Sequence, residues 1–221
     1  MKPFPFFAGV YALLLVSQLN ASVVNGKVMF LTKRGQRPVV NETLVWLEPA
    51  GKAPKRPPAT FSMPTRGKTF VPHVLAVPAG STVAFPNEDP ISHNLFSLTP
   101  GHTFDLGLYR RGPGKSRQFE SAGVVNVYCN VHPNMSAVVH VMDTPWYGFA
   151  DANGDYSFDV PAGQYRLVAW NEQGGTAASD IDVRSDGKIT GATLLTIDGR
   201  NFRTVAHTNK NGQAYKAPKD Y

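Results

Sequence analysis

The chain of 221 residues contains one cysteine, Cys129, which precedes His132 by three positions and Met135 by six. A thiolate, an imidazole and a thioether therefore occupy one short stretch. A second imidazole, His93, follows a strand-like segment upstream. Two histidines, one cysteine and a weakly bound axial methionine are the ligands of trigonal copper sites that transfer electrons, and the soft sulfurs suit Cu(I). The spacing predicts His93, Cys129, His132 and Met135 as the ligands of one copper ion.

Each of these residues also has an ordinary interpretation. A lone cysteine is most often a small buried hydrophobe. Structural zinc would favour more cysteine or histidine ligands and no methionine. A cysteine nucleophile would need an orienting group and an oxyanion hole, which no local motif indicates. The combination of these four ligands favours copper, and we expect no enzymatic activity. Multicopper oxidases need several His-x-His pairs and binuclear copper centres need two cysteines, and the sequence has neither.

The two ligand segments resemble those of the cupredoxins, the small blue copper proteins of the plastocyanin and amicyanin kind. The matching motifs are Asp89-x3-His93-Asn94 and Tyr128-Cys129-x2-His132-Pro133-x-Met135. The resemblance covers roughly residues 22–142, and the wider run is similar to a periplasmic set labelled methylamine-utilisation or plastocyanin-like proteins. It implies one type 1 copper per chain, with Met135 as the axial ligand and the other three residues as equatorial ligands. It also implies that Asn94 braces the ligand loop.

Short apolar runs separated by proline and glycine turns predict an all-β chain with a Greek-key sandwich. The expected strands are residues 23–31, 43–47, 69–77, 81–85, 93–97, 104–109, 115–120, 124–128 and 137–142. A proline-rich loop covers residues 48–63, because proline lacks a donor for a strand ladder. Cys129 then follows one strand and Met135 precedes the next, so the ligand loop caps one end of the sandwich. We assign residues 22–143 to this copper-binding domain.

After residue 143 a second pattern of strands and turns begins. Asn153-Gly154 is a strong signal for a two-residue hairpin, and residues 161–163 (Pro-Ala-Gly) predict another turn. The stretch resembles the regulatory-like, transthyretin-type β-sandwich that is often appended to secreted proteins. We assign residues 144–199 to this small second sandwich. Residues 200–221 contain few apolar side chains, and we expect them to form a basic, flexible tail.

The first 21 residues read as a secretory signal, with Lys2 before an apolar run that is too short to favour a membrane span. Charge is divided unevenly along the chain: residues 22–142 carry +7, residues 143–199 carry −6 and residues 200–221 carry +4. Export argues against a nucleic-acid partner, so the basic surface is expected to steer an acidic redox protein or to lie near an anionic membrane. Alternatively, the acidic stretch could dock on the basic domain of the same chain.

Three functions follow from these features. The first is a periplasmic or otherwise exported one-electron carrier with a blue copper site. The second is a copper-binding or copper-delivery protein that shuttles no electrons. The third is a cell-surface interaction module in which the C-terminal domain does the recognising, and the intact ligand set argues against it. A structural role is favoured for His73, although a second metal remains open there, and His140 is expected to be a packing residue.

Overall fold

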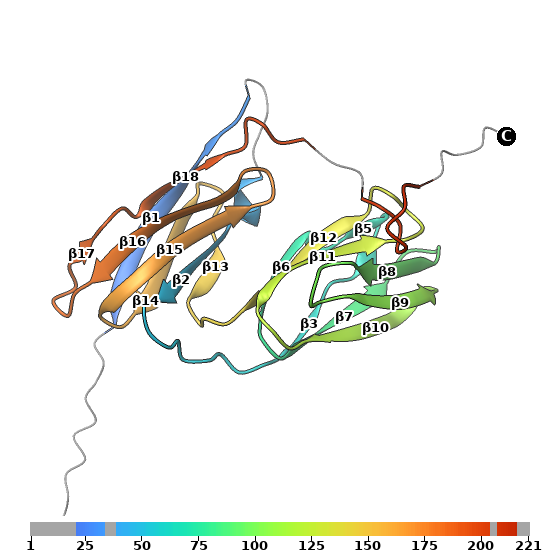
Figure 1. Ribbon diagram of the computed structural model, residues 1–221, viewed down its shortest axis with the longest axis horizontal. Helices are drawn as coiled ribbons and strands as arrows, with labels where there is room; N and C mark the ends of the chain where they lie inside the picture. Colours follow the sequence, from blue (N-terminus) through green and yellow to red (C-terminus); the bar gives the residue numbers. More distant parts are fainter. Residues whose placement is uncertain (1–20, 34–38, 204–206, 216–221) are drawn as a thin grey trace, which may run out of the picture.

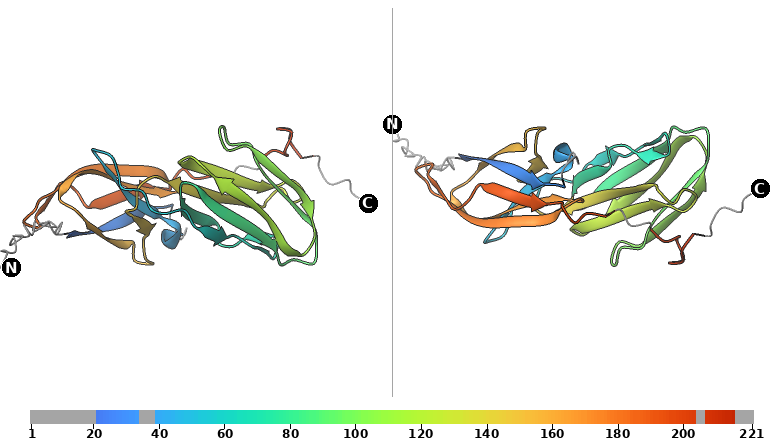
Figure 2. Two further views of the ribbon diagram at one scale, coloured as in Figure 1. Left: turned by 90° about the horizontal axis from the view of Figure 1, so that it is seen from below. Right: turned by 90° about the horizontal axis from the view of Figure 1, so that it is seen from above.

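The computed structural model describes residues 21–33, 39–203 and 207–215 of the chain. These residues form an all-β structure of two sandwiches, as predicted, which lie end to end (Figures 1 and 2). In these ranges the helical structure is a 3-10 helix at Val40–Glu42. None of the described helical structure is long and apolar enough to cross a membrane. The predicted secretory signal lies outside the described residues, apart from residue 21.

One sandwich is built from residues 60–142, and we call it the inserted sandwich. Two five-stranded sheets form it. The strands are β3 (Thr60–Ser62), β4 (Thr65–Arg66), β5 (Thr69–Phe70), β6 (Val74–Pro78), β7 (Ser81–Asn87), β8 (His93–Ser97), β9 (Phe104–Tyr109), β10 (Gly112–Phe119), β11 (Gly123–Cys129) and β12 (Ser136–Met142). One sheet has the order β6-β12-β11-β8-β9, and the other has the order β10-β7-β4-β5 with β3 beside β7. Both sheets contribute to one core that contains Phe85, Val127 and Cys129.

The other sandwich is split in the sequence around the inserted one, and we call it the split sandwich. Its strands are β1 (Ser22–Leu31), β2 (Leu44–Pro49), β13 (Tyr147–Phe149), β14 (Asp155–Val160), β15 (Gly163–Asn171), β16 (Gly175–Val183), β17 (Ile189–Thr190) and β18 (Leu194–Asp198). The sheets are β14-β1-β18 and β13-β2-β15-β16-β17.

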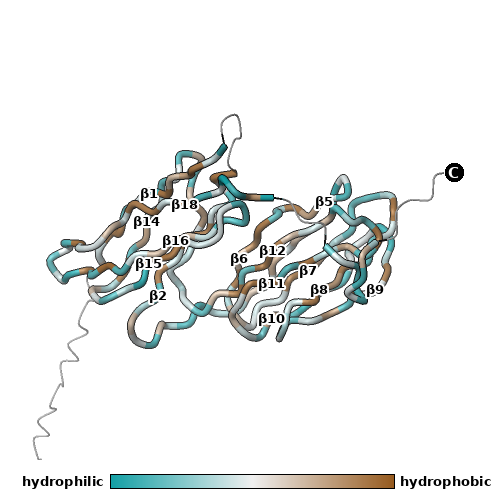
Figure 3. The backbone as a smooth tube through the Cα atoms, turned by 45° about the horizontal axis from the view of Figure 1, so that its top comes forward, coloured by the Kyte–Doolittle hydropathy of each residue, from teal (hydrophilic) through white to brown (hydrophobic). Residues whose placement is uncertain are grey.

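The predicted boundary between the domains is wrong at its N-terminal end. Strands β1 and β2 were assigned to the copper-binding domain, but β1 pairs with β14 and β18, and β2 pairs with β13 and β15. Val24 on β1 and Leu47 on β2 are accordingly buried in the core of the split sandwich. Apolar residues lie along the strands of both sandwiches (Figure 3). Buried and exposed positions alternate along β1, whereas β2 has buried residues on both faces, and neither pattern specifies a partner strand.

Local turn signals have mixed outcomes. The predicted strand at residues 69–77 is divided into β5 and β6, and two short strands, β3 and β4, were not predicted. Asn153-Gly154 forms a turn but not a hairpin, because β13 and β14 on either side belong to different sheets. Gly154 has a φ of 86°, and a Cβ atom there would lie 2.2 Å from the carbonyl oxygen of Val28. The turn therefore joins the two layers of the split sandwich.

The interface between the sandwiches contains a small apolar cluster formed by Leu44, Ala76 and Met142. His140 on β12 projects into this interface and lies against Trp170 of β15, with ring centroids 4.3 Å apart. An ion pair borders it, in which His73 Nε2 lies 2.6 Å from Glu172 Oε2. The acidic stretch thus contacts the basic domain of the same chain, which was one of the possibilities read from the charge distribution.

Candidate metal centre

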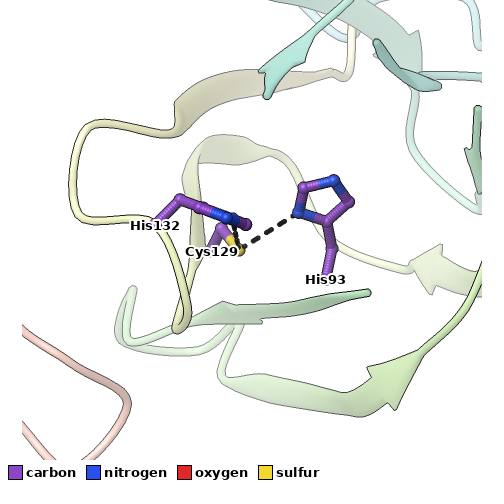
Figure 4. A group of neighbouring side chains, drawn as sticks. All are labelled: His93, Cys129 and His132. Atoms are coloured by element: carbon purple, nitrogen blue, oxygen red, sulfur yellow. Dashed lines mark hydrogen bonds between the residues drawn. The ribbon is translucent and has the colours of Figure 1, made fainter. Parts of the chain in front are cut away.

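The structure brings His93, Cys129 and His132 together at one end of the inserted sandwich (Figure 4). The Sγ atom of Cys129 lies 3.7 Å from Nδ1 of His93 and 3.6 Å from Nδ1 of His132. A metal bonded to sulfur at about 2.3 Å and to nitrogen at about 2.0 Å, at tetrahedral to trigonal angles, separates those atoms by about 3.5 to 3.8 Å. The three donor atoms are therefore spaced so that all of them can bond to one metal ion. A thiolate with two imidazoles is a ligand set that fits copper.

His93 is oriented by a buried carboxylate. It is the first residue of β8, and its Nε2 lies 2.9 Å from Oδ2 of Asp89 in the preceding turn. An Nε2–H donated to this carboxylate leaves the lone pair on Nδ1, which faces the thiol. Such contacts behind a metal-binding histidine set the tautomer and raise the basicity of the ring. Asp89 is thus suited to hold His93 in the form that binds a metal.

Asp89 is itself held as an anion. Its carboxylate accepts hydrogen bonds from the main-chain N–H groups of Gly67 (2.6 Å) and Lys68 (3.0 Å) in the β4–β5 turn. Burial by itself would raise the pKa of Asp89, but the hydrogen bonds from Lys68, His93 and Gly67 outweigh it, so the pKa is lowered. The charge needed behind His93 is therefore present at neutral pH.

The loop from Cys129 to Met135 is closed by its own backbone. The N–H of Cys129 donates to the carbonyl of Met135 at 3.0 Å, and the N–H of Met135 donates to the carbonyl of His132 at 3.1 Å. The N–H of Asn130 donates to the carbonyl of Asn94 at 2.8 Å, so the backbone of Asn94 joins the loop to β8. Its side chain points elsewhere and donates to Oδ1 of Asp105 at 2.6 Å.

The four predicted ligands differ in exposure. His93 and Cys129 are fully buried, Met135 is 1% exposed, and His132 is partly exposed beside Val131, which is 46% exposed. Desolvation lowers the pKa of His132, and the nearby charges of His93 and Lys68 lower it further. His132 is consequently neutral and able to ligate near pH 7, and its ring is the part of the cluster nearest to solvent.

Met135 lies in the same buried core as Cys129. Its backbone closes the loop that carries the other two C-terminal donors, which places the thioether at the correct end of the sandwich. The assignment of Met135 as an axial ligand stays a prediction.

Two features of the site were not assigned a role from the sequence. Asp89 stands four residues before His93, and that spacing in a turn is the signal that could have identified it as the partner of the imidazole. The other feature is the segment 207–215, which was expected to be a flexible tail. It packs against the inserted sandwich, where His207 stacks on Tyr128 at a centroid distance of 4.4 Å and an interplanar angle of 21°. No local sequence pattern indicates this contact.

His73 has a structural role in the described residues. Its Nε2 lies against Glu172, and its Nδ1 lies 3.0 Å from the carbonyl oxygen of Ser136. Both partners are acceptors, so the protonated ring can donate to both of them. The hydrogen bond to Glu172 raises the pKa of His73 against the opposing effect of burial. Within the described part of the chain, only one group of three or more histidine, cysteine, aspartate or glutamate side chains is spaced to hold a metal. That group is His93, Cys129 and His132.

Comparisons with known proteins find structural similarity over part of the chain. No family model matches the chain, and no curated protein matches it in sequence. Among solved structures, an oxidised amicyanin variant is similar over 44% of this chain and 99% of its own, with 18% identity and a TM-score of 0.36. A purple cupredoxin from Nitrosopumilus maritimus is similar over 38% of this chain and 99% of its own, with 28% identity and a TM-score of 0.31.

Proposed function

We propose that the protein is an exported type 1 copper protein that carries single electrons between redox partners and is not an enzyme. The observation that supports this most directly is the position of the Cys129 Sγ, 3.7 and 3.6 Å from the Nδ1 atoms of two imidazoles. The bound copper would supply the Cu(II)/Cu(I) couple. Met135 serves as the axial ligand in this proposal, and one copper is held per chain.

The residues around the cluster suit electron transfer because they limit rearrangement. His93 begins a strand that is buried along its whole length. Its imidazole is held by Asp89, and the backbone of the ligand loop is hydrogen-bonded at Cys129, Asn130 and Met135. A preorganised set of ligands on rigid strands changes little when the charge of the ion changes.

Burial also favours a carrier over a delivery protein. A protein that hands copper to another must expose its ligands to the recipient, whereas His93 and Cys129 have no exposed surface. His132 alone among the ligand histidines reaches the surface, which suits the passage of an electron through its ring.

An acidic redox partner would be attracted to the end of the inserted sandwich that carries the cluster. Arg110 and Arg111 are exposed in the turn between β9 and β10. The ladder pairs Tyr109 with His93, which places this turn at the metal-binding end of the sandwich. These cations would attract an acidic protein toward the exposed edge of His132.

Visible spectroscopy of the purified protein titrated with Cu(II) tests the proposal. We expect one equivalent of copper to produce an intense thiolate-to-copper absorption that Cys129→Ser abolishes. His102→Gln is the matched control, because it removes a histidine outside the cluster and should leave the absorption intact. A colourless copper complex, or a colour that survives Cys129→Ser, would refute the blue copper site.

Electrochemistry of the coloured protein separates the carrier from the delivery protein. A carrier gives a reversible one-electron wave and retains copper during reduction and re-oxidation. Loss of copper on reduction, with transfer to a competing chelator, would favour delivery instead.

A further inference from the structure

Residues 207–215 form a compact turn beside the ligand loop (Figure 1, dark red). The side chain of Asn209 organises it, since its Oδ1 accepts hydrogen bonds from the N–H groups of Asn211 (2.9 Å) and Gln213 (3.0 Å). The backbone N–H of Asn209 also donates to the carbonyl of Gln213 at 2.7 Å. The segment therefore has its own folded shape on the surface of the inserted sandwich.

Lys210 bonds directly to the ligand loop and reaches the His93 strand through Asp105. Its backbone N–H donates to Oδ1 of Asn130 at 2.9 Å, directly after Cys129. Its ammonium group lies 2.7 Å from Oδ2 of Asp105, and the other oxygen of that carboxylate accepts the side chain of Asn94, directly after His93. Asn94 and Asn130 are joined through their backbones. These bonds form a closed ring that connects the His93 strand to the start of the ligand loop.

Tyr215 provides a second connection. Its hydroxyl donates to the carbonyl oxygen of Cys129 at 2.9 Å. Its ring packs edge-on against His207, which stacks on Tyr128. The N–H of Cys129 is bonded to Met135, so Tyr215 occupies the remaining main-chain polar group of the cysteine.

We propose that the segment 207–215 is a positioning element of the metal centre, in which Lys210 and Tyr215 hold the Cys129 and His93 segments in a fixed relation. The inference rests on the proposed copper site and adds a part of the chain more than 60 residues beyond Met135 to it. The segment follows β18, the last strand of the split sandwich. A part of the chain that comes after one sandwich therefore supports the metal centre in the other.

The contacts of Lys210 and Tyr215 are expected to fix the geometry of the metal centre more than to stabilise the folded protein. The side chains of Lys210 and Asp105 are 37% and 39% exposed, and exposed ion pairs of this kind stabilise proteins only slightly. The hydrogen-bond partners behind metal ligands, in contrast, affect the binding of the metal strongly. The expected effect of removing the contacts is therefore on the copper centre, with little change in unfolding.

The test is the double variant Lys210→Met/Tyr215→Phe in the full chain. With Cu(II) bound, we expect a shifted thiolate-to-copper band, a shifted reduction potential and a copper affinity lowered by up to about tenfold. In the copper-free protein, we expect faster hydrogen exchange at the N–H of Asn130, while the urea midpoint stays close to that of the wild type. The single variant Lys210→Met should show part of these changes. Lys210→Arg, which keeps the cation beside Asp105, should stay close to the wild type.

Two substitutions in the split sandwich serve as matched controls. Lys27→Met removes a lysine–aspartate pair of the same length, 2.7 Å, and Tyr165→Phe removes a hydroxyl that donates to the carbonyl of Pro161 at 2.8 Å. Neither should move the absorption band or the potential. A double variant with the band, potential and Asn130 exchange of the wild type would overturn the positioning role. If the wild type gives no colour with copper, the proposed function fails, and Asn130 exchange in the copper-free protein still decides whether the segment holds the loop.

Discussion

His140 should make the protein less stable in acid, because it is buried as a neutral ring between the two sandwiches. It is 3% exposed and its Nε2 has no hydrogen-bond partner among the described residues. Trp46 of β2 and Trp170 of β15 lie against it, and the adjoining cavity of about 380 Å³ is lined by Glu48, Asp143 and Arg166, among others. Burial lowers the pKa of His140 to about 4.

The sign and size of the effect follow from that pKa. An unfolded histidine titrates near pH 6.5, so the unfolded state binds a proton before the folded state does as pH falls. Stability is therefore complete above pH 6.5 and is lost toward pH 4. Between pH 7.5 and pH 5, a shift from 6.5 to about 4 removes about 2 kcal/mol of the free energy of unfolding.

Urea unfolding of the copper-free protein measures this contribution. We expect His140→Leu to abolish about 2 kcal/mol of the acid-dependent loss between those two pH values. It should be at least as stable as the wild type at pH 7.5, because it removes an unsatisfied polar atom. His102→Gln, which changes a partly exposed histidine outside the interface, is the control and should keep the wild-type slope. An equal pH dependence in the wild type and His140→Leu would refute the reasoning.

Three further outcomes are expected. Met135→Leu should still bind copper and stay coloured but show a raised reduction potential, because the oxidised ion loses a donor; an unchanged potential in voltammetry would remove Met135 from the ligand set. Charge reversal at Arg110 and Arg111 should slow electron exchange with an acidic partner without altering the copper spectrum. The wild-type rate in stopped flow should fall as salt shortens the Debye length from about 10 Å at 0.1 M, and rates indifferent to both changes would place docking elsewhere. Glu172→Gln should lower the stability below pH 6.5, where His73 is charged, by no more than about 1 kcal/mol, and the difference should vanish above the raised pKa of His73; a deficit that persists at high pH would mean that the ion pair is not its cause.

The sequence by itself predicted the all-β class and the donor residues. Cys129, His132 and Met135 lie within one loop, so their proximity is a local property of the chain. The predicted bounds of β8 and β9 agree with the structure because apolar runs between proline and glycine turns determine both ends of a strand. His93 joins the loop because β8 and β11 are neighbours in one sheet, which a sandwich makes probable but does not specify.

Only the tertiary structure decided the partners of the strands. The apolar residues of β1 and β2 require burial but leave the partner strand open, so the place of these strands in the split sandwich depends on pairing with residues more than 100 positions away. The same holds for Lys210 and Tyr215, whose polar side chains and polar neighbours predict a solvated tail. Their hydrogen bonds to Asn130, Asp105 and Cys129 exist because a folded surface presents those acceptors together. Ligands that are close together in the sequence could therefore be predicted from it. Contacts between distant segments could not, because they exist only in the fold that brings those segments together.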